Sequence, residues 1–313
     1  MTALRNWLKC RRPQLLGVTL LLAVGGLTSS EGQSGTAIYY RGQTIAPAFE
    51  GWEEQPDGTF DLVFGYLNRN VEEYFHIPVG PNNRVEPGDL DRGQPTYFLP
   101  GRNHYIFRVR VPKDFGKKEV AWFVTSHGKT ESAYGSLRPE YVLDDVMMSG
   151  NFGGDRRSDT ERNKKPVVTI EGRTERTVRV NEPLALTALA SDDGVPKVAP
   201  APNTAFSIAS AKGLRVTWSV YRGAGEAVTF APEQFLPYPD RRKYANSPWR
   251  AGWMPPPLPA DGKFPVTVTF SEPGTYVLRV IASDGGLTAY QPVTVTVLGA
   301  SPVGDARSIA PSR

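Results

Sequence analysis

Alternation of apolar and polar residues is clearest near the end of the chain, where it runs through three successive segments. These read F-P-V-T-V-T-F from Phe264, T-Y-V-L-R-V-I-A from Thr275 and Q-P-V-T-V-T-V-L from Gln291. A period of two over β-branched residues places one face of each strand on a core and the other face in water. Turn residues separate the segments at Glu272–Gly274 and Asp284–Gly286. The pattern therefore predicts the closing strands of an antiparallel β-sandwich.

Residues 36–145 show no amphipathic helix pattern and consist of short aromatic segments separated by turn residues. The run Thr59–Tyr66 carries its apolar side chains on one face and follows the turn Gln55–Gly58, which predicts a hairpin with Ala48–Trp52. Further strands are predicted at Glu72–Val79, His104–Val111, Glu119–Thr125 and Thr130–Tyr134. In the strand His104–Val111, the side chains expected to face the core are Tyr105, Phe107, Val109 and Val111. Short strands at this spacing favour a sandwich or a small barrel.

Residues 166–298 continue the alternating pattern and add two landmarks. Trp218 shares one face of the run Leu214–Tyr221 with aliphatic neighbours, and Gly274–Leu278 reads G-T-Y-V-L. The second landmark resembles the tyrosine corner of immunoglobulin-like sandwiches, in which the hydroxyl bonds backbone a few residues upstream. With P-G-T-Y-V-L-R-V-I-A-S-D-G-G before the final strand, the region resembles the polycystic-kidney-disease (PKD) and cadherin-like branch of that fold. The resemblance implies a core position for Trp218 and no particular activity, and the chain departs from the family in one large insertion.

Together these patterns predict an all-β protein of two β-sandwich domains, the second immunoglobulin-like or PKD-like. The first domain, residues 36–145, resembles uncharacterised exported bacterial proteins, and that resemblance brings no known activity with it. Residues 146–165 are polar and contain several glycines, and such a segment cannot bury enough apolar surface to offset its ordering entropy. We expect a flexible linker there and a disordered tail at residues 299–313.

Residues 1–30 have the layout of a secretory signal peptide. Four basic residues precede the apolar run Leu15–Leu27, and small and polar residues follow from Thr28 to Gly35. The run is short for a bilayer-spanning helix, yet no A-x-A cleavage site is evident, so cleavage and retention as an uncleaved anchor both stay open. We expect a periplasmic or secreted protein that contacts a membrane only through this segment, and only if it stays uncleaved.

The chain has 36 basic and 32 acidic residues, and the excess is local. Residues 1–30 contain four basic residues and no acidic one, which leaves 32 of each kind in the rest. Such a balanced chain provides no sustained field for phosphates, so nucleic acid is not an expected partner. The only cysteine of the sequence, Cys10, lies in the leader, so disulfide and thiol chemistry are not expected beyond it.

Two similar acidic turns follow apolar strands, A-S-D-D-G from Ala190 and A-S-D-G-G from Ala282. If their strands are the second and sixth of an immunoglobulin-like order, Asp192, Asp193 and Asp284 converge at one end of the sandwich. Three carboxylates repel one another, and a calcium ion relieves that repulsion. The competing interpretation is that Asp and Gly are simply good turn formers. Calcium is the only cofactor for which the sequence offers a site.

An irregular loop from Arg84 to Gly101 is rich in glycine, proline and acidic residues. Long loops on a rigid β-scaffold often carry binding sites. Glu86, Asp89 and Asp91 offer oxygen ligands for a hard cation, although their spacing does not match an EF-hand. An ordinary solvated loop is the competing interpretation.

The insertion from Ala231 to Lys263 contains repeated prolines that forbid a continuous strand or helix. Its Trp249, Trp253 and Met254 are a large apolar load for a loop. Such side chains either fold back over a sheet edge and protect it from pairing, or present a binding surface to a protein or a sugar ring.

No catalytic motif is recognisable, so no catalytic residue is assigned. His76, His104 and His127 lie in separate segments without metal-ligand spacing, and no G-x-S-x-G elbow occurs. The sequence favours an exported, non-catalytic binding, structural or adhesion protein with a protein or glycan partner at the cell envelope. The alternative is a small secreted hydrolase or an accessory carbohydrate-binding module. A pocket that contains two carboxylates with displaced pKa values favours this alternative.

Overall fold

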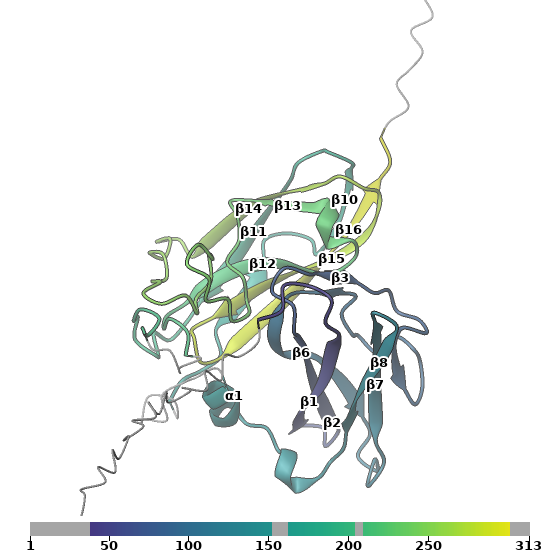
Figure 1. Cartoon of the computed structure of the whole chain (residues 1–313). Coiled ribbons are helices and arrows are strands. Elements are labelled where there is room, and N and C mark those ends of the chain that lie inside the picture. Colours follow the sequence, from purple (N-terminus) through teal and green to yellow (C-terminus); the bar gives the residue numbers. More distant parts are fainter. Residues whose placement is uncertain (1–37, 152–161, 204–208, 301–313) are drawn as a thin grey trace, which may run out of the picture. The chain divides into compact units, whose positions relative to one another are not determined.

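The computed structural model describes residues 38–151, 162–203 and 209–300 (Figure 1). These residues are nearly all in strands and loops, with one α-helix and two 3₁₀ turns among them. They belong to one compact unit, and the predicted leader and most of the predicted tail lie outside the described residues. Within the described ranges, no helix has the length and apolar character needed to cross a membrane.

The first half of the described chain forms two three-stranded sheets, ordered β1-β2-β6 and β4-β7-β8, and a small sheet β3-β5. Strand β1 of the first sheet lies against β7 and β8 of the second, which makes a sandwich. The strands are β1 (Ile45–Glu54), β2 (Phe60–Asn68), β3 (Phe75–His76), β4 (Asn83–Glu86), β5 (Tyr97–Phe98), β6 (Gly101–Val111), β7 (Val120–Ser126) and β8 (Lys129–Gly135).

An aromatic cluster forms the core of this first sandwich. The Trp122 ring on β7 is fully buried, 4.8 Å from the Phe107 ring and 6.3 Å from the Phe64 ring between centroids. Leu62, Phe64 and Tyr66 alternate along β2 into this core, as their spacing predicts. Fully burying one such large apolar side chain contributes about 1.5–3 kcal/mol.

The predicted hairpin is confirmed, with Glu54 of β1 opposite Phe60 of β2 across the turn Gln55–Gly58. The predicted strand Glu72–Val79 is wrong in extent, since only Phe75–His76 pairs in the sheet. Pro78 lacks the N–H that a continued ladder requires, so the pairing stops just before it.

The predicted orientation of Tyr105 is also wrong. A bulge interrupts the pairing of β2 with β6, and Tyr105 lies in it with φ 55°. The side chain leaves the core of Phe107 and joins a smaller cluster with Val63 and Leu287. Extra residues in one strand change which face the neighbouring side chains occupy, and a regular alternation in the sequence does not reveal them.

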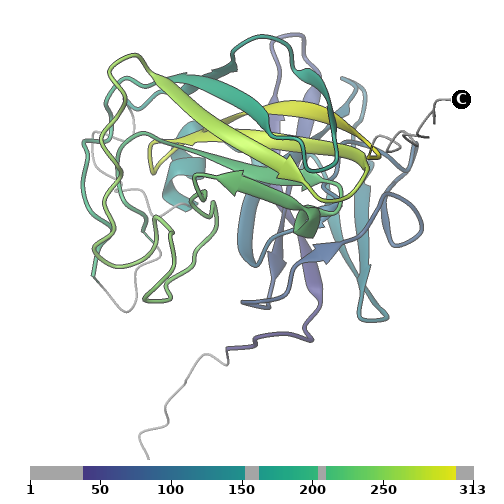
Figure 2. The ribbon, with the colours of Figure 1, turned by 90° about the horizontal axis from the view of Figure 1, so that it is seen from above.

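The second half forms two four-stranded sheets, ordered β10-β16-β15-β12 and β13-β14-β11-β9. β10 pairs in parallel with β16, and the other pairs are antiparallel. The elements are β9 (Val167–Ile170), β10 (Glu175–Arg179), β11 (Leu184–Ser191), β12 (Arg215–Arg222), η2 (Gly225–Ala227), β13 (Val228–Ala231), β14 (Lys263–Phe270), β15 (Gly274–Ser283) and β16 (Thr288–Leu298). Figure 2 shows the long strands of this half in green to yellow. The arrangement is an immunoglobulin-like β-sandwich, so the predicted fold class is confirmed.

Both sequence landmarks occupy the positions that the resemblance implies. Trp218 on β12 is buried in the core between the two sheets, opposite Val280 of β15 in the strand register. The Tyr276 hydroxyl on β15 donates to the carbonyl of Glu272, four residues upstream, at 3.0 Å. This hydrogen bond is the tyrosine corner that the segment G-T-Y-V-L predicts.

Part of the segment predicted to be a flexible linker is folded. The turn η1 (Pro139–Tyr141) leads into α1 (Asp145–Asn151), whose Met148 is buried beside Leu287. At the far end of the same segment, Asn163 is buried against the second sandwich. The polar composition does not predict these buried positions, because a single apolar side chain, Met148, and a single amide, Asn163, hold the two ends of the segment. Residues 152–161 lie outside the described residues, and the domain limits stay predictions.

Candidate functional site

β12 is an edge strand, and two other parts of the chain cover its open edge. Gln234 of the insertion accepts a hydrogen bond from the backbone N–H of Trp218 at 2.9 Å. Further along the strand, the N–H of Thr96 donates to the carbonyl of Tyr221 at 3.1 Å. An uncovered edge is a template for pairing with another chain, and these contacts block it. The insertion and the first sandwich therefore attach to the same strand.

The three predicted binding residues of the insertion occupy different environments. Trp249 is buried, with its ring 5.8 Å from the guanidinium of Arg215, so it anchors the insertion. Trp253 is half-buried, and its ring meets that of Phe235 edge-on at 4.9 Å. Met254 is exposed. The insertion therefore fits both interpretations in part: the buried Trp249 helps to cover the sheet, and the exposed Met254 is available for contact with a partner.

The irregular loop predicted to bind a cation contains a contact between the two sandwiches. Asp91 accepts hydrogen bonds from both terminal nitrogens of Arg222 at 2.7 and 2.9 Å, and these bonds hold its pKa below the usual range. The same guanidinium donates to the carbonyl of Gln94 at 2.9 Å. Asp91 therefore has a structural partner that competes with any metal ion.

The other two acidic side chains of this loop do not join Asp91. Glu86 pairs with Arg84 within β4 at 2.6 Å, so the segment predicted as an irregular loop begins with a strand, and Asp89 is exposed. Across the described part of the chain, no group of three or more His, Cys, Asp or Glu side chains is arranged to hold a metal ion. The cation site at Glu86, Asp89 and Asp91 remains a prediction without a preformed cluster.

The two acidic turns of the second sandwich bring a pair of carboxylates close together. Asp284 is fully buried and accepts the backbone N–H of Gly286 at 2.6 Å and of Leu287 at 2.7 Å. Burial, together with the nearby negative charge of Asp284, raises the pKa of Asp192 to about 6. Two carboxylates in such surroundings favour a proton or a cation between them.

An amide completes this arrangement. Asn163 donates to Asp284 at 2.9 Å, while its own Oδ1 and the Oδ1 of Asp192 are buried without a hydrogen-bond partner. Asp193 is turned to the backbone, where it accepts the N–H of Lys164 at 3.2 Å and of Val195 at 2.9 Å. The oxygen atoms available to a hard cation are therefore those of Asp192, Asp284 and Asn163. Calcium binding at Asp192, Asp193 and Asp284 stays a prediction.

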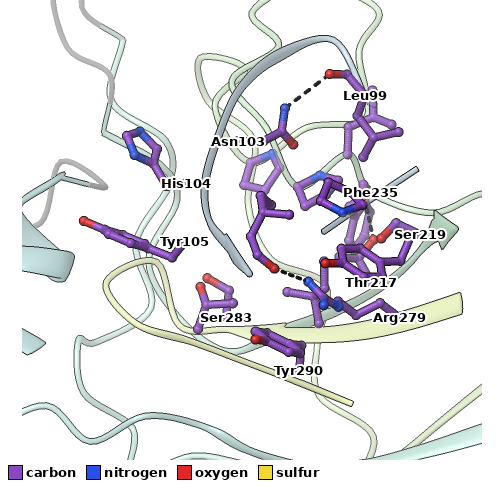
Figure 3. A pocket seen from close by; sticks show the side chains of 18 of the residues that line it. Leu99, Asn103, His104, Tyr105, Thr217, Ser219, Phe235, Arg279, Ser283 and Tyr290 are labelled. Carbon is purple, nitrogen blue, oxygen red and sulfur yellow. Dashed lines mark hydrogen bonds between the residues drawn. The ribbon is translucent and has the colours of Figure 1, made fainter. Parts of the chain in front are cut away.

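A cavity of about 100 Å³ lies between β6 and the outer face of the sheet that contains β12 and β15 (Figure 3). The floor of the cavity is the polar side of the alternating pattern, since the neighbouring Val216 and Trp218 face the core. Its floor residues are Arg215, Thr217 and Ser219 on β12 and Arg279, Ile281 and Ser283 on β15. Phe235, Leu236 and Trp249 of the insertion and Ile106 of β6 add apolar walls.

Two of the floor residues are buried arginines. The guanidinium of Arg279 lies 3.5 Å from the Tyr221 ring centroid and 4.0 Å from that of Tyr290, and its Nη1 donates to the carbonyl of Ile106 at 2.6 Å. Arg215 donates to a backbone carbonyl at 3.0 Å and to the Ser283 hydroxyl at 3.2 Å. Burial lowers the pKa of Arg215 to about 10, although the charge of Asp284 opposes this shift.

The chemistry of the cavity differs from what a glycoside hydrolase needs. Among the described residues that line it, there is no aspartate or glutamate. Hydrolysis of a glycosidic bond ordinarily uses a pair of carboxyl groups that flank the substrate. The cavity offers guanidinium, hydroxyl and aromatic groups, which bind and orient a ligand.

Comparison with known proteins gives structural likeness at low identity. No protein-family profile and no curated protein matches the chain. A titin M10–obscurin-like immunoglobulin-domain complex is 14% identical, covers 45% of this chain and 99% of that chain, and has a TM-score of 0.24. The fibronectin(III)-like modules of Clostridium thermocellum CbhA are 14% identical over 82% of this chain and 95% of theirs, with a TM-score of 0.23. The Yersinia pseudotuberculosis adhesin InvE is 13% identical over 80% of this chain and 58% of its own, with a TM-score of 0.20. The assignment of the fold here rests on the sheet order and the tyrosine corner.

The cavity and its arginines are the features that sequence reasoning missed. Arg215 and Arg279 fall on the polar side of their strands, where alternation predicts exposure to water. A usable signal was Arg279 itself, a charged residue in the middle of the apolar run T-Y-V-L-R-V-I-A. Nothing in the pattern indicates that the first sandwich and the insertion cover this face.

Proposed function

We propose that this chain is an exported, non-catalytic binding protein of the cell envelope that takes a protein or glycan partner through its insertion. The main support for the proposal is that some side chains of the insertion Ala231–Lys263 are buried and others are exposed. Tyr238 and Trp249 are buried, whereas Tyr244 is 76% and Met254 47% exposed. The insertion thus combines firm anchors with exposed side chains suited to contact a partner.

The exposed side chains have the chemistry of a recognition surface. The guanidinium of Arg242 lies 5.3 Å from the centroid of the Tyr244 ring. The same guanidinium donates a hydrogen bond to Asp240 at 3.0 Å. Tyrosine and arginine are enriched among the residues that dominate binding energy at interfaces. An aromatic face also suits the apolar side of a sugar ring. A segment that is already anchored loses less conformational freedom on binding than a free loop does.

The localisation is tested by fractionating a bacterial host that produces the full chain with a C-terminal tag. We expect the tagged protein in the periplasm, the medium or the membrane fraction, and we expect a variant without residues 1–30 in the cytosol. Recovery of the full chain in the cytosol overturns the export part of the proposal.

The binding part is tested by titrating isolated envelopes with the purified protein and measuring the bound fraction. We expect saturable binding that falls at least tenfold in the combined variant Tyr244→Ala and Met254→Ala, with an unchanged Tm. Leu90→Ala is the matched control, because Leu90 is 48% exposed and lies in a loop of the first sandwich. Equal binding by all three proteins, or no saturable binding, contradicts the proposal.

We also propose that calcium binds at the acidic end of the second sandwich. The support is the pair of carboxylates Asp192 and Asp284 with the unpartnered amide oxygen of Asn163. Calorimetric titration of the full chain with CaCl₂ is expected to give heat and a higher Tm. Asp192→Asn should remove both effects, and Asp193→Asn should keep them, because Asp193 is committed to backbone N–H groups. Absence of heat with an unchanged Tm removes calcium from the account.

A further inference from the structure

We propose that the cavity between the two sandwiches binds a small organic carboxylate, held by the guanidinium group of Arg279, with Arg215 at the other end of the cavity floor. This site is separate from the exposed side chains of the insertion, and neither proposal depends on the other. The cavity, the arginines and their unfilled hydrogen-bonding capacity are independent observations that lead to the same ligand class.

Within the part of the chain that the structure describes, Arg279 carries a buried positive charge without an acidic partner, whereas the charge of Asp284 acts on Arg215. Arg215 is 5% and Arg279 8% exposed, and among the described residues neither forms an ion pair or a hydrogen bond with a carboxylate. A buried charge without a partner costs several kcal/mol, so such groups are normally paired. Arg108, which lines the same cavity, has such a partner, because its Nε donates a hydrogen bond to the carboxylate of Glu53 at 2.7 Å.

Hydrogen-bonding capacity also remains on Arg279. Its Nε is buried and has no hydrogen-bond partner, although Nη1 donates to the carbonyl of Ile106. Tyr221 and Tyr290 lie against the guanidinium and fix its orientation. A guanidinium held in one plane presents its N–H groups as a fork, which matches the two oxygens of a carboxylate.

The rest of the cavity selects the body of the ligand. Ile106, Leu236 and Trp249 line it with apolar surface, and Ser219 and Ser283 add hydroxyl groups. In the strand register Arg215 faces Ser283 and Arg279 faces Ser219, so the two arginines lie about four residues apart along the floor, or roughly 13 Å. A volume of about 100 Å³ favours a small ligand over an oligosaccharide or a nucleotide, because pockets for drug-sized ligands run to several hundred Å³. A short or ring-bearing acid with one carboxylate fits these constraints.

The test compares acids with their neutral amides on the full chain, in a fixed mild detergent at constant ionic strength. Acetate, butyrate and benzoate are titrated beside acetamide, butyramide and benzamide, with inorganic phosphate and chloride as further arms, and Tm is measured. We expect a saturable rise in Tm for at least one acid, because a ligand that binds only the folded state stabilises it. The dissociation constant of that acid should be at least tenfold lower than that of its amide.

Two variants locate the effect. Arg279→Lys keeps the charge and loses the planar fork, so it should weaken acid binding about tenfold. Arg215→Lys lies at the other end of the cavity floor and should weaken acid binding less than Arg279→Lys does. Arg110→Lys is the matched control, because Arg110 is an exposed arginine of β6 that pairs with Asp61 away from the cavity. The proposal is overturned if no acid gives a saturable shift, if acid and amide bind alike, or if phosphate binds more tightly than every carboxylate. The comparison of acids with amides decides the matter even if both lysine variants fail to fold.

Discussion

Tyr276 shows how a single side chain fixes the end of a sandwich. Its ring is buried 4.9 Å from that of Phe270, and its hydroxyl reaches the carbonyl of Glu272. The ring contributes apolar burial, and the hydroxyl satisfies a backbone acceptor at the start of β15. The two contributions can be separated, because phenylalanine keeps the first and removes the second.

We expect Tyr276→Phe to lower the free energy of unfolding by about 1 kcal/mol, the usual net value of one hydrogen bond. Urea denaturation measures the change. Tyr134→Phe is the control, because Tyr134 is largely exposed on β8 and should leave stability unchanged. Equal stability of Tyr276→Phe and the parent protein removes the tyrosine corner from the account of this fold.

Asp192 provides a prediction about pH. Burial first, and the charge of Asp284 second, raise its pKa from 3.8 to about 6. A carboxyl group whose pKa is raised on folding contributes stability below pH ~4, and this contribution is lost as the pH rises through about 6. Asparagine stays neutral, so Asp192→Asn should match the parent near pH ~3.5 and exceed it near pH ~7.5.

The expected gain of Asp192→Asn at the higher pH is about 1 kcal/mol, because solvent around this half-exposed group screens part of the repulsion. Thermal unfolding in EDTA at both pH values measures it without a bound cation. A difference between the two proteins that is the same at both pH values shows that Asp192 does not titrate in this range.

At the scale of elements, β12 is where the sequence was hardest to interpret. Its Trp218 face was predictable, because Leu214, Val216 and Val220 alternate with it. Its edge was not, because the partners of that edge lie 16 residues away in sequence at Gln234 and far upstream at Thr96. The alternation of apolar and polar residues predicts which face of a strand is buried, but it does not predict which segment covers the edge of a sheet.

The same limit explains the other differences between prediction and structure. Val266 and Val268 follow the simple period and lie in the core as expected. Tyr105 does not, because a local bulge changes the facing of its side chain. Among the candidate sites, Asp192 and Asp284 were found from repeated turn residues. Asn163 was missed, because a lone asparagine in a polar segment carries no signal of burial.

The insertion yields a prediction that separates anchor from surface. Trp249→Ala should cost about 3 kcal/mol in unfolding free energy, because it empties a buried site. Trp253→Ala should cost about 1 kcal/mol, since its ring is only half-buried. Chemical denaturation of the two variants beside the parent measures both. A Trp253 variant that loses more stability than the Trp249 variant contradicts the assigned roles.

At the scale of the whole molecule, the two sandwiches are joined by side chains from both halves. Arg222 bonds Asp91 and the carbonyl of Gln94, and Arg279 bonds the carbonyl of Ile106. Leu287 of the second sandwich is buried with Val63 and Met148. The cavity between β6 and β12 keeps its shape only while this junction holds.

Arg222→Ala tests the junction directly. It removes the bidentate contact to Asp91 and the hydrogen bond to Gln94, so we expect a loss of about 1–2 kcal/mol in unfolding free energy. Arg84→Ala is the control, because its partners Glu86 and Phe123 both belong to the first sandwich, so no contact across the junction is lost. If both variants lose the same stability, the contact across the junction contributes nothing special.

The central claim is that the two β-sandwiches behave as one cooperative unit. Differential scanning calorimetry of the full chain tests it most directly, because separate domains melt separately and a coupled unit melts once. We predict one heat-absorption peak whose calorimetric enthalpy equals the van't Hoff enthalpy. Two resolved peaks, each matching one sandwich, would contradict it.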